Sequence, residues 1–317
     1  MVKRIEWVDM ARGLSMLAIL LFHTEVYYGE KDIIPYSLYV EDVLATFFIL
    51  SGYLFLSREK SLNLKHKLHS VARFIVVPYL FFTSIIYIPK ELIHGNAINI
   101  QNFLYSIFSG EASWFVSSLI LSEVYFIFIH YIAKGKLSLI TLLSFIPFVY
   151  YMICPKFKEF AIPCVSTISV IFVFIGYLYR MYENSIERVG KYIFAITLFL
   201  LLTMKVYECF NHLKMVFFWM DVDNYILFFT DTLCFSYIII YICKKVKRAP
   251  CIEWIGQRSL VYYFICGGVP LVVAKLMPAY NGAYYMIVIA FTATVFVSTV
   301  LTWLIYKYLT CILGRKI

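Results

Sequence analysis

Residues 284–306 read YYMIVIAFTATVFVSTVLTWLIY, a run of 23 residues without a charged side chain. An α-helix rises about 1.5 Å per residue, so about 20 mainly apolar residues are enough to cross the hydrocarbon core of a bilayer. A transmembrane strand would instead alternate apolar and polar residues over about ten positions. The run is long and shows no such alternation, so we predict a transmembrane helix.

Similar runs recur along the whole chain. Apolar residues make up 62% of the 317 positions and charged residues only 15%, whereas a soluble domain is about 45–50% apolar. The ten predicted helices span 10–28, 38–57, 74–93, 114–133, 137–153, 162–181, 192–208, 225–243, 259–277 and 284–306. The connections are too short for an independent core. We therefore predict an all-α fold, a polytopic bundle of about ten transmembrane helices that forms one domain, 1–317.

The basic residues predict the orientation of this bundle. If the N-terminus is cytoplasmic, 21 of the 28 Lys and Arg residues fall on the inner side and 7 on the outer side. Lys and Arg collect in cytoplasmic loops, so both termini are predicted to be cytoplasmic. The first apolar segment contains Arg12 and His23 and lacks a small-residue cleavage site, so it should remain as the first helix.

Composition also argues against two kinds of partner. The net charge is +9, but the basic residues are scattered among short loops and form no single patch, so no nucleic-acid surface is predicted. The eight cysteines show no CxxC motif and no paired Cys/His spacing. No metal site is therefore predicted.

The first predicted helix carries the densest set of ionisable residues. Asp9, Arg12 and His23 lie 3, 11 and 14 residues apart, and at about 100° per residue these separations return to within about 60° of one face. Ionisable groups inside lipid are costly and mark either function or structural pairing. His23 would lie about 16 Å above Arg12, near mid-membrane. An imidazole with an ordinary pKa of about 6.5 can take a proton from a hydroxyl there.

Arg12 has a natural partner in Asp9, one turn away, and the pair could also hold an anionic substrate group. The structural alternative is that Asp9 and Arg12 form an ion pair at the membrane edge, while His23 hydrogen-bonds a neighbouring helix. The other buried polar candidates within predicted helices are the acidic residues Glu25, Asp42, Glu123 and Asp231. For Glu123 and Asp231 hydrogen bonding between helices is the simplest interpretation.

A basic stretch lies between the second and third predicted helices. Its basic candidates are Arg58, Lys65, Lys67, His69 and Arg73, and we expect a cytoplasmic loop. Such a cluster could bind anionic lipid headgroups or the phosphates of a cytosolic nucleotide-bearing donor. The sequence contains no glycine-rich phosphate loop that would decide between them.

Four stretches form a pattern in a fixed order: RIEWVDMARG at 4–13 followed by His23, FFILSGYL at 47–54, SWF at 113–115, and IGQRSL at 255–260 leading to Tyr263. This pattern resembles the type-three membrane acyltransferases, bacterial enzymes that O-acylate polysaccharides and other envelope molecules. The chain departs from that family at two places. Arg73 stands alone where members carry an arginine pair, and Cys266 stands where many have a histidine.

The resemblance implies an enzyme of the bacterial plasma membrane, surrounded by membrane lipids. Its donor would be cytoplasmic acetyl-CoA or another acyl-CoA, and its acceptor a glycan or lipid-linked glycan reached from the other side. His23 would act as a general base or as a transient acyl carrier, and Arg12, held by Asp9, would orient His23 or the donor. The basic stretch would bind the donor phosphates. Residues predicted to line the substrate site are Ser51, Trp114, Glu123 and Tyr263.

A transporter of a glycan or lipid-linked precursor is the alternative function. A bundle of ten helices with a buried His/Arg/Asp face suits it equally well. Against it, the sequence shows no inverted repeats and no paired helices broken by Gly or Pro.

Overall fold

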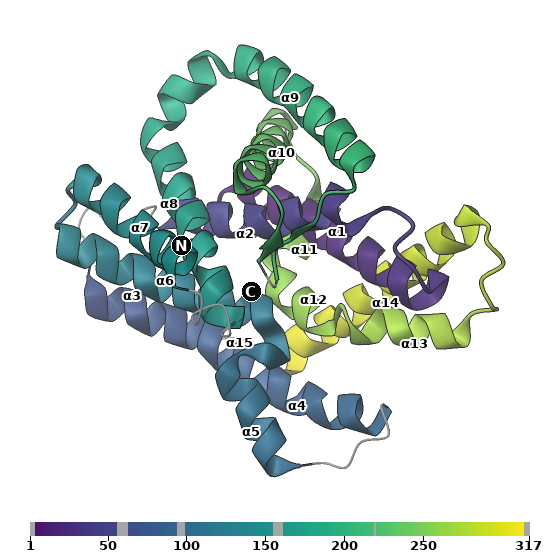
Figure 1. Ribbon diagram of the computed structural model, residues 1–317. Helices are drawn as coiled ribbons and strands as arrows, with labels where there is room; N and C mark the ends of the chain where they lie inside the picture. Colours follow the sequence, from purple (N-terminus) through teal and green to yellow (C-terminus); the bar gives the residue numbers. More distant parts are fainter. Residues whose placement is uncertain are drawn as a thin grey trace. The chain divides into compact units, whose positions relative to one another are not determined.

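The computed structural model describes residues 4–55, 63–93, 99–154, 161–218, 220–246 and 248–313, and it confirms the all-α, polytopic fold (Figure 1). The α-helices are α1 (Glu6–Gly29), α2 (Val40–Leu54), α3 (Leu64–Val71), α4 (Val77–Ile93), α5 (Ile100–Ser109), α6 (Trp114–Ala133), α7 (Leu137–Ile153), α8 (Ala161–Arg188), α9 (Gly190–Asn211), α10 (Tyr225–Lys245), α11 (Pro250–Gln257), α12 (Ser259–Ile265), α13 (Gly268–Leu276), α14 (Tyr284–Tyr308) and α15 (Thr310–Leu313). Short elements are η1 (Tyr36–Leu38), the π-helix η2 (Ala72–Val76), η3 (Glu111–Ser113), and the paired strands β1 (Met215–Val216) and β2 (Asp221–Val222).

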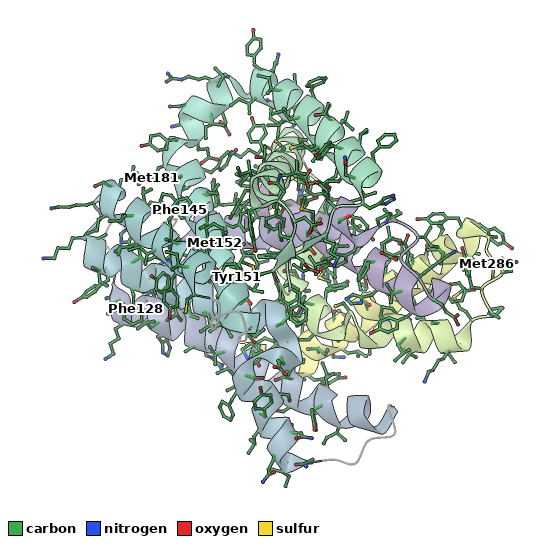
Figure 2. All side chains as sticks on the ribbon, viewed as in Figure 1. Phe128, Phe145, Tyr151, Met152, Met181 and Met286 are labelled. Carbon is green, nitrogen blue, oxygen red and sulfur yellow. The ribbon has the colours of Figure 1, made fainter. Side chains whose placement is uncertain are left out.

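Within the described residues, each of the ten predicted spans coincides at least in part with helical structure. Among the described residues, six helices are long and apolar enough to cross a bilayer, and the bent pair α12 and α13 raises the number to seven. The helix α7 is apolar but shorter. Many apolar side chains on these helices are exposed, including the labelled Phe128, Phe145, Met152 and Met181 (Figure 2). Such exposure is expected of surfaces that face lipid.

The structure differs from the prediction at several places. The helices α5 and α11 and the strands β1 and β2 lie in segments predicted as connections. Two further differences concern the basic stretch and one predicted span. The basic stretch expected to be a loop is helical from Leu64, because Asn63 caps α3 by accepting the backbone N–H of His66 at 3.1 Å. The span predicted over 259–277 is bent by 53° between α12 and α13. Pro270 explains the bend, since it has no N–H to donate to the carbonyl of Cys266 and its ring would clash with that carbonyl.

The chain divides into two compact units. The first comprises Met1–Phe47, Asn184–Val216 and Val222–Tyr308, and the second comprises Phe48–Glu183, Phe217–Asp221 and Leu309–Ile317.

In the first unit, α1 packs against α10, α11, α13 and α14 (Figure 1, purple against green to yellow). Two glycines allow α1 and α11 to touch through their main chains. A Cβ atom at Gly256 would lie 1.7 Å from the carbonyl oxygen of Asp9, and one at Gly13 would lie 2.1 Å from that of Ile252. No side chain larger than hydrogen fits either position, so this crossing fixes the N-terminal part of α1 against the IGQRSL stretch.

In the second unit, a similar crossing joins α2 and α8. A Cβ atom at Gly52 or at Gly176 would lie 1.8 Å from a carbonyl oxygen of the other helix. Beside it lies an aromatic cluster centred on the fully buried Phe217, whose ring contacts those of Phe48, Trp114 and Phe172. This packing holds the FFILSGYL and SWF stretches together.

Candidate active site

All three predicted catalytic residues lie on α1 in the first unit. Asp9, Arg12 and His23 are half-buried along this continuous helix of 24 residues. Glu6 and Asp9 occupy its first turn, where acidic side chains complement the helix dipole. The helix therefore carries the guanidinium and the imidazole on one rigid support, separated by eleven residues, or about 16 Å.

Aromatic side chains hold His23 at the other end of this stripe. The imidazole stacks on the ring of Tyr27, with centroids 6.0 Å apart and planes 14° from parallel, and meets the ring of Phe22 edge-on at 5.5 Å. Phe22 in turn packs against Tyr36 at 4.9 Å. A pocket of about 220 Å³ lies next to Tyr27, lined by the last turn of α1 and by Pro278 to Tyr280.

Phe22 also contacts a second polar residue, Tyr36. The phenol of Tyr36 is hydrogen-bonded to the buried carboxyl of Glu41 and lies within electrostatic range of Tyr263. Burial first, and then the neighbouring Glu41 carboxylate, raise the pKa of Tyr36 well above its ordinary value. Tyr263 thus lies near Tyr36, whose ring packs on Phe22 beside His23, and its role in substrate binding stays a prediction.

The N-terminal end of the stripe lies near a buried arginine. Arg258 follows α11 directly, is 7% exposed, and lies within electrostatic range of Asp9. Its guanidinium lies over the ring of Trp254 at 4.2 Å and over that of Tyr306 at 5.2 Å. The close crossing of α11 with α1 is what brings Arg258 to Asp9.

The other predicted wall residues lie in the second unit. Ser51 on α2 donates a hydrogen bond to the carboxyl of Glu123 on α6, so the structure brings these two together. Trp114 opens α6, and its ring packs on Phe218 with centroids 4.9 Å apart. Nine residues, or about 14 Å of helix, separate Trp114 from Glu123.

The basic candidates occupy α3 and the π-helix after it, also in the second unit. Lys65 and His69 are exposed and four residues apart, so they share one face of α3. Lys67 donates to the carbonyl of Phe55, and Arg73 donates to the carbonyl of Cys311. Arg58 lies outside the described residues. Two of the four described bases therefore have structural partners, and two face outward.

Sequence reasoning missed a buried ion cluster in the first unit. Lys205 on α9 contacts Asp42 at 2.8 Å, Glu208 at 3.6 Å and the carboxyl of Asp231, and it donates to the carbonyl of Ser37 at 2.9 Å. The prediction that Asp231 hydrogen-bonds across helices is confirmed. The role of Lys205 was hidden because it was counted only as an outer-side cation.

Two other polar residues near α1 were missed for a similar reason. Glu41 stands at the start of α2 and Arg258 stands at a helix junction, so each would be expected at a solvated helix end. The sequence did hold one sign of the role of Arg258, because this residue lies within IGQRSL (255–260), one of the four stretches of the pattern.

A protein-family model described as an acyltransferase domain, Acyl_transf_3, matches residues 5–307. The chain belongs to this acyltransferase family. The match runs through both units and covers the four sequence stretches except Arg4. Neither a curated protein nor a solved structure matches it significantly.

The family match decides between the two functions considered for this sequence. The chain is a multi-pass membrane acyltransferase, and the transporter alternative is set aside. An acyltransferase requires an acyl donor and an acceptor. The described residues contain no group of three or more His, Cys, Asp or Glu side chains that could hold a metal ion.

Proposed function

We propose that this acyltransferase, as one domain over 1–317, moves an acetyl group from cytoplasmic acetyl-CoA to a hydroxyl of a cell-envelope or exported glycan. We place it in a bacterial plasma membrane with both termini cytoplasmic. The observation that carries the proposal is the stripe on α1, with a guanidinium at one end and an aromatic-held imidazole about 16 Å away. The stripe would let a donor held at the inner end reach a base near an outer pocket.

In the proposed reaction, the acceptor hydroxyl oxygen attacks the thioester carbonyl carbon and the C–S bond breaks. His23 takes the hydroxyl proton and returns it to the departing thiolate, so the reaction releases free CoA with no net proton. Alternatively, His23 first accepts the acyl group on its ring nitrogen and then passes it to the acceptor. Arg12, held by Asp9, orients His23 or the donor in both versions.

The remaining predicted residues support the substrates in this proposal. The pocket beside Tyr27 offers an approach for the acceptor, since it lies one turn beyond His23. We keep Tyr263 of the first unit, and Ser51, Trp114 and Glu123 of the second unit, as proposed substrate-binding residues. The exposed face of α3 with Lys65 and His69, together with Lys67, Arg73 and Arg58, attracts donor phosphates by charge.

The test is acyl transfer by the purified full-length chain in liposomes. Radiolabelled acetyl-CoA is supplied, and both label transfer and free CoA release are followed. We expect His23→Ala to lose transfer by at least about a hundredfold, the lower range for removing a general base, and Arg12→Lys to be impaired because the planar fork is lost.

A matched control comes from His212, an exposed histidine at the end of α9 with a positive φ of 49°. His212→Asn should keep full activity, since Asn tolerates that backbone conformation. Full transfer by folded His23→Ala would remove the catalytic role assigned to this imidazole.

A further inference from the structure

We propose that Arg258, together with Arg12, binds the donor pyrophosphate at the inner end of α1, through the phosphate that bears the pantetheine arm. This inference rests on the proposal that acyl-CoA is the donor. It assigns a binding residue that is not among the basic candidates of α3.

The first argument is the hydrogen bonding of Arg258. Its side chain is 7% exposed, and its Nη1 donates to the carbonyl of Trp254 at 3.2 Å. Its Nε is buried and has no hydrogen-bond partner among the described residues. A guanidinium has five N–H donors, and a buried cation is costly unless it is paired and hydrogen-bonded. The site is therefore incomplete without an acceptor.

The second argument is orientation. Trp254 and Tyr306 both contact the guanidinium, at 4.2 Å and 5.2 Å from their ring centroids. Cation–π contacts of this kind fix a guanidinium while leaving its N–H donors in its plane. Planar paired donors match a phosphate better than a lysine ammonium does.

The third argument is the balance of charge where α1 and α11 cross. Asp9 and Arg4 both lie within electrostatic range of Arg258, and Arg4 is fixed beside it by donating to Gln257. Arg12 is on the stretch of α1 that touches α11 through its main chain. Within electrostatic range of Arg258, the Asp9 carboxylate thus offsets one of two guanidinium charges, those of Arg4 and Arg258, and a bound anion would offset the other.

The fourth argument is length. The pantetheine arm has about 13 bonds from its phosphate to its sulfur, and an extended chain covers about 3.3–3.6 Å per three bonds, so the arm reaches about 15 Å. The eleven residues from Arg12 to His23 span about 16 Å of helix. A phosphate held at the level of Arg12 would therefore place the thioester next to the imidazole.

The test measures equilibrium binding of CoA and dephospho-CoA to the full-length chain in phosphatidylcholine nanodiscs. Dephospho-CoA keeps the pyrophosphate and lacks the 3′-phosphate. We expect Arg258→Gln to raise the Kd of both ligands by about tenfold to a hundredfold, the value of a charge-assisted hydrogen bond. Arg258→Lys should lie between this variant and the wild type. The exposed Arg248 supplies the control, and Arg248→Gln should bind as the wild type does.

A direct contact also changes how salt affects binding. Screening weakens charge pairing, so the Kd of the wild type should rise more steeply with salt than that of Arg258→Gln. An unchanged CoA affinity in Arg258→Gln would overturn the proposal. So would a loss seen with CoA but absent with dephospho-CoA, or a loss that leaves the salt dependence unchanged, as a purely structural defect would.

A lipid phosphate is the other source of the same chemistry. If Arg258 held a lipid headgroup, phosphatidylglycerol would compete with CoA in the wild type, and Arg258→Gln in phosphatidylcholine would bind CoA normally, which contradicts the proposal. Different results would count against the proposed function. His23→Ala should bind CoA as the wild type does while losing transfer, and a wild type that binds no CoA would remove acyl-CoA as the donor.

Discussion

The cluster around Lys205 makes a sharp prediction about stability. Replacing Lys205 with Met removes an ammonium group that contacts Asp42, Asp231 and Glu208, which are all buried. Removing one partner of a buried ion pair costs about 3–5 kcal/mol because a buried charge is left uncompensated. The Lys205 side chain is 14% exposed, so water can enter in part. We therefore expect a loss at the lower end, about 3 kcal/mol in the free energy of unfolding.

The assay is unfolding of the purified chain by a denaturing detergent, followed by tryptophan fluorescence. Lys191, exposed near the start of the same helix α9, provides the control. Lys191→Met should change the free energy of unfolding by less than about 0.5 kcal/mol, as is usual for a surface site. The difference between the two variants isolates the cluster from any general effect of losing a lysine on α9.

Removing an acid should act differently from removing the base. Three carboxylates share one ammonium and repel each other, so Asp231→Asn should cost less than Lys205→Met. The double variant should be more stable than the sum of the single changes predicts, with a coupling of about 1 kcal/mol or more. A Lys205→Met protein as stable as the wild type, or additive single changes, would refute the view that ionic contacts hold α9 to α2 and α10.

Two further predictions concern packing and hydrogen bonding. Gly256→Ala should prevent the close crossing of α1 and α11 and lower the melting temperature, whereas Gly268→Ala, with no atom within 4 Å of its Cβ position, should not. Equal melting temperatures would contradict the crossing. Glu123→Gln keeps an acceptor for Ser51, so it should stay within about 1 kcal/mol of the wild type, while Glu123→Leu should cost about 1–3 kcal/mol by leaving a hydroxyl unpaired. Equal free energies of unfolding for Glu123→Leu and Glu123→Gln would count against the hydrogen bond between Ser51 and Glu123.

Helix positions were predictable because lipid imposes a length and a polarity on every span. Local breaks were harder to see. The bend before Pro270 was readable in principle, since the proline and the preceding Gly267 and Gly268 lie within an apolar segment. The start of α3 was also readable, because Asn63 is a good N-cap residue. Both signals were weaker than the apolar runs around them.

Only the part of the candidate site that lies on a single helix could be predicted from the sequence. The shared face of Asp9, Arg12 and His23 follows from helical geometry alone, and it lies on α1 as expected. Contacts between distant segments could not be read in this way. Arg258 reaches Asp9 across about 250 residues of chain, and Lys205 reaches Asp42 across 163. No periodicity reports such pairs, since they depend on which helices pack together.

The two glycine crossings show that some residues of the four sequence stretches serve helix packing and not chemistry. Gly13 and Gly256 come from the first and last stretches and lie at one main-chain contact, and Gly52 makes another contact with α8. These glycines are needed because no Cβ atom fits, whatever reaction the protein performs. Chemical roles should therefore be sought in the polar members of the same stretches. On α1 those include Asp9, Arg12 and His23, and the crossing that the glycines permit is what brings Arg258 to the end of the helix that carries Asp9.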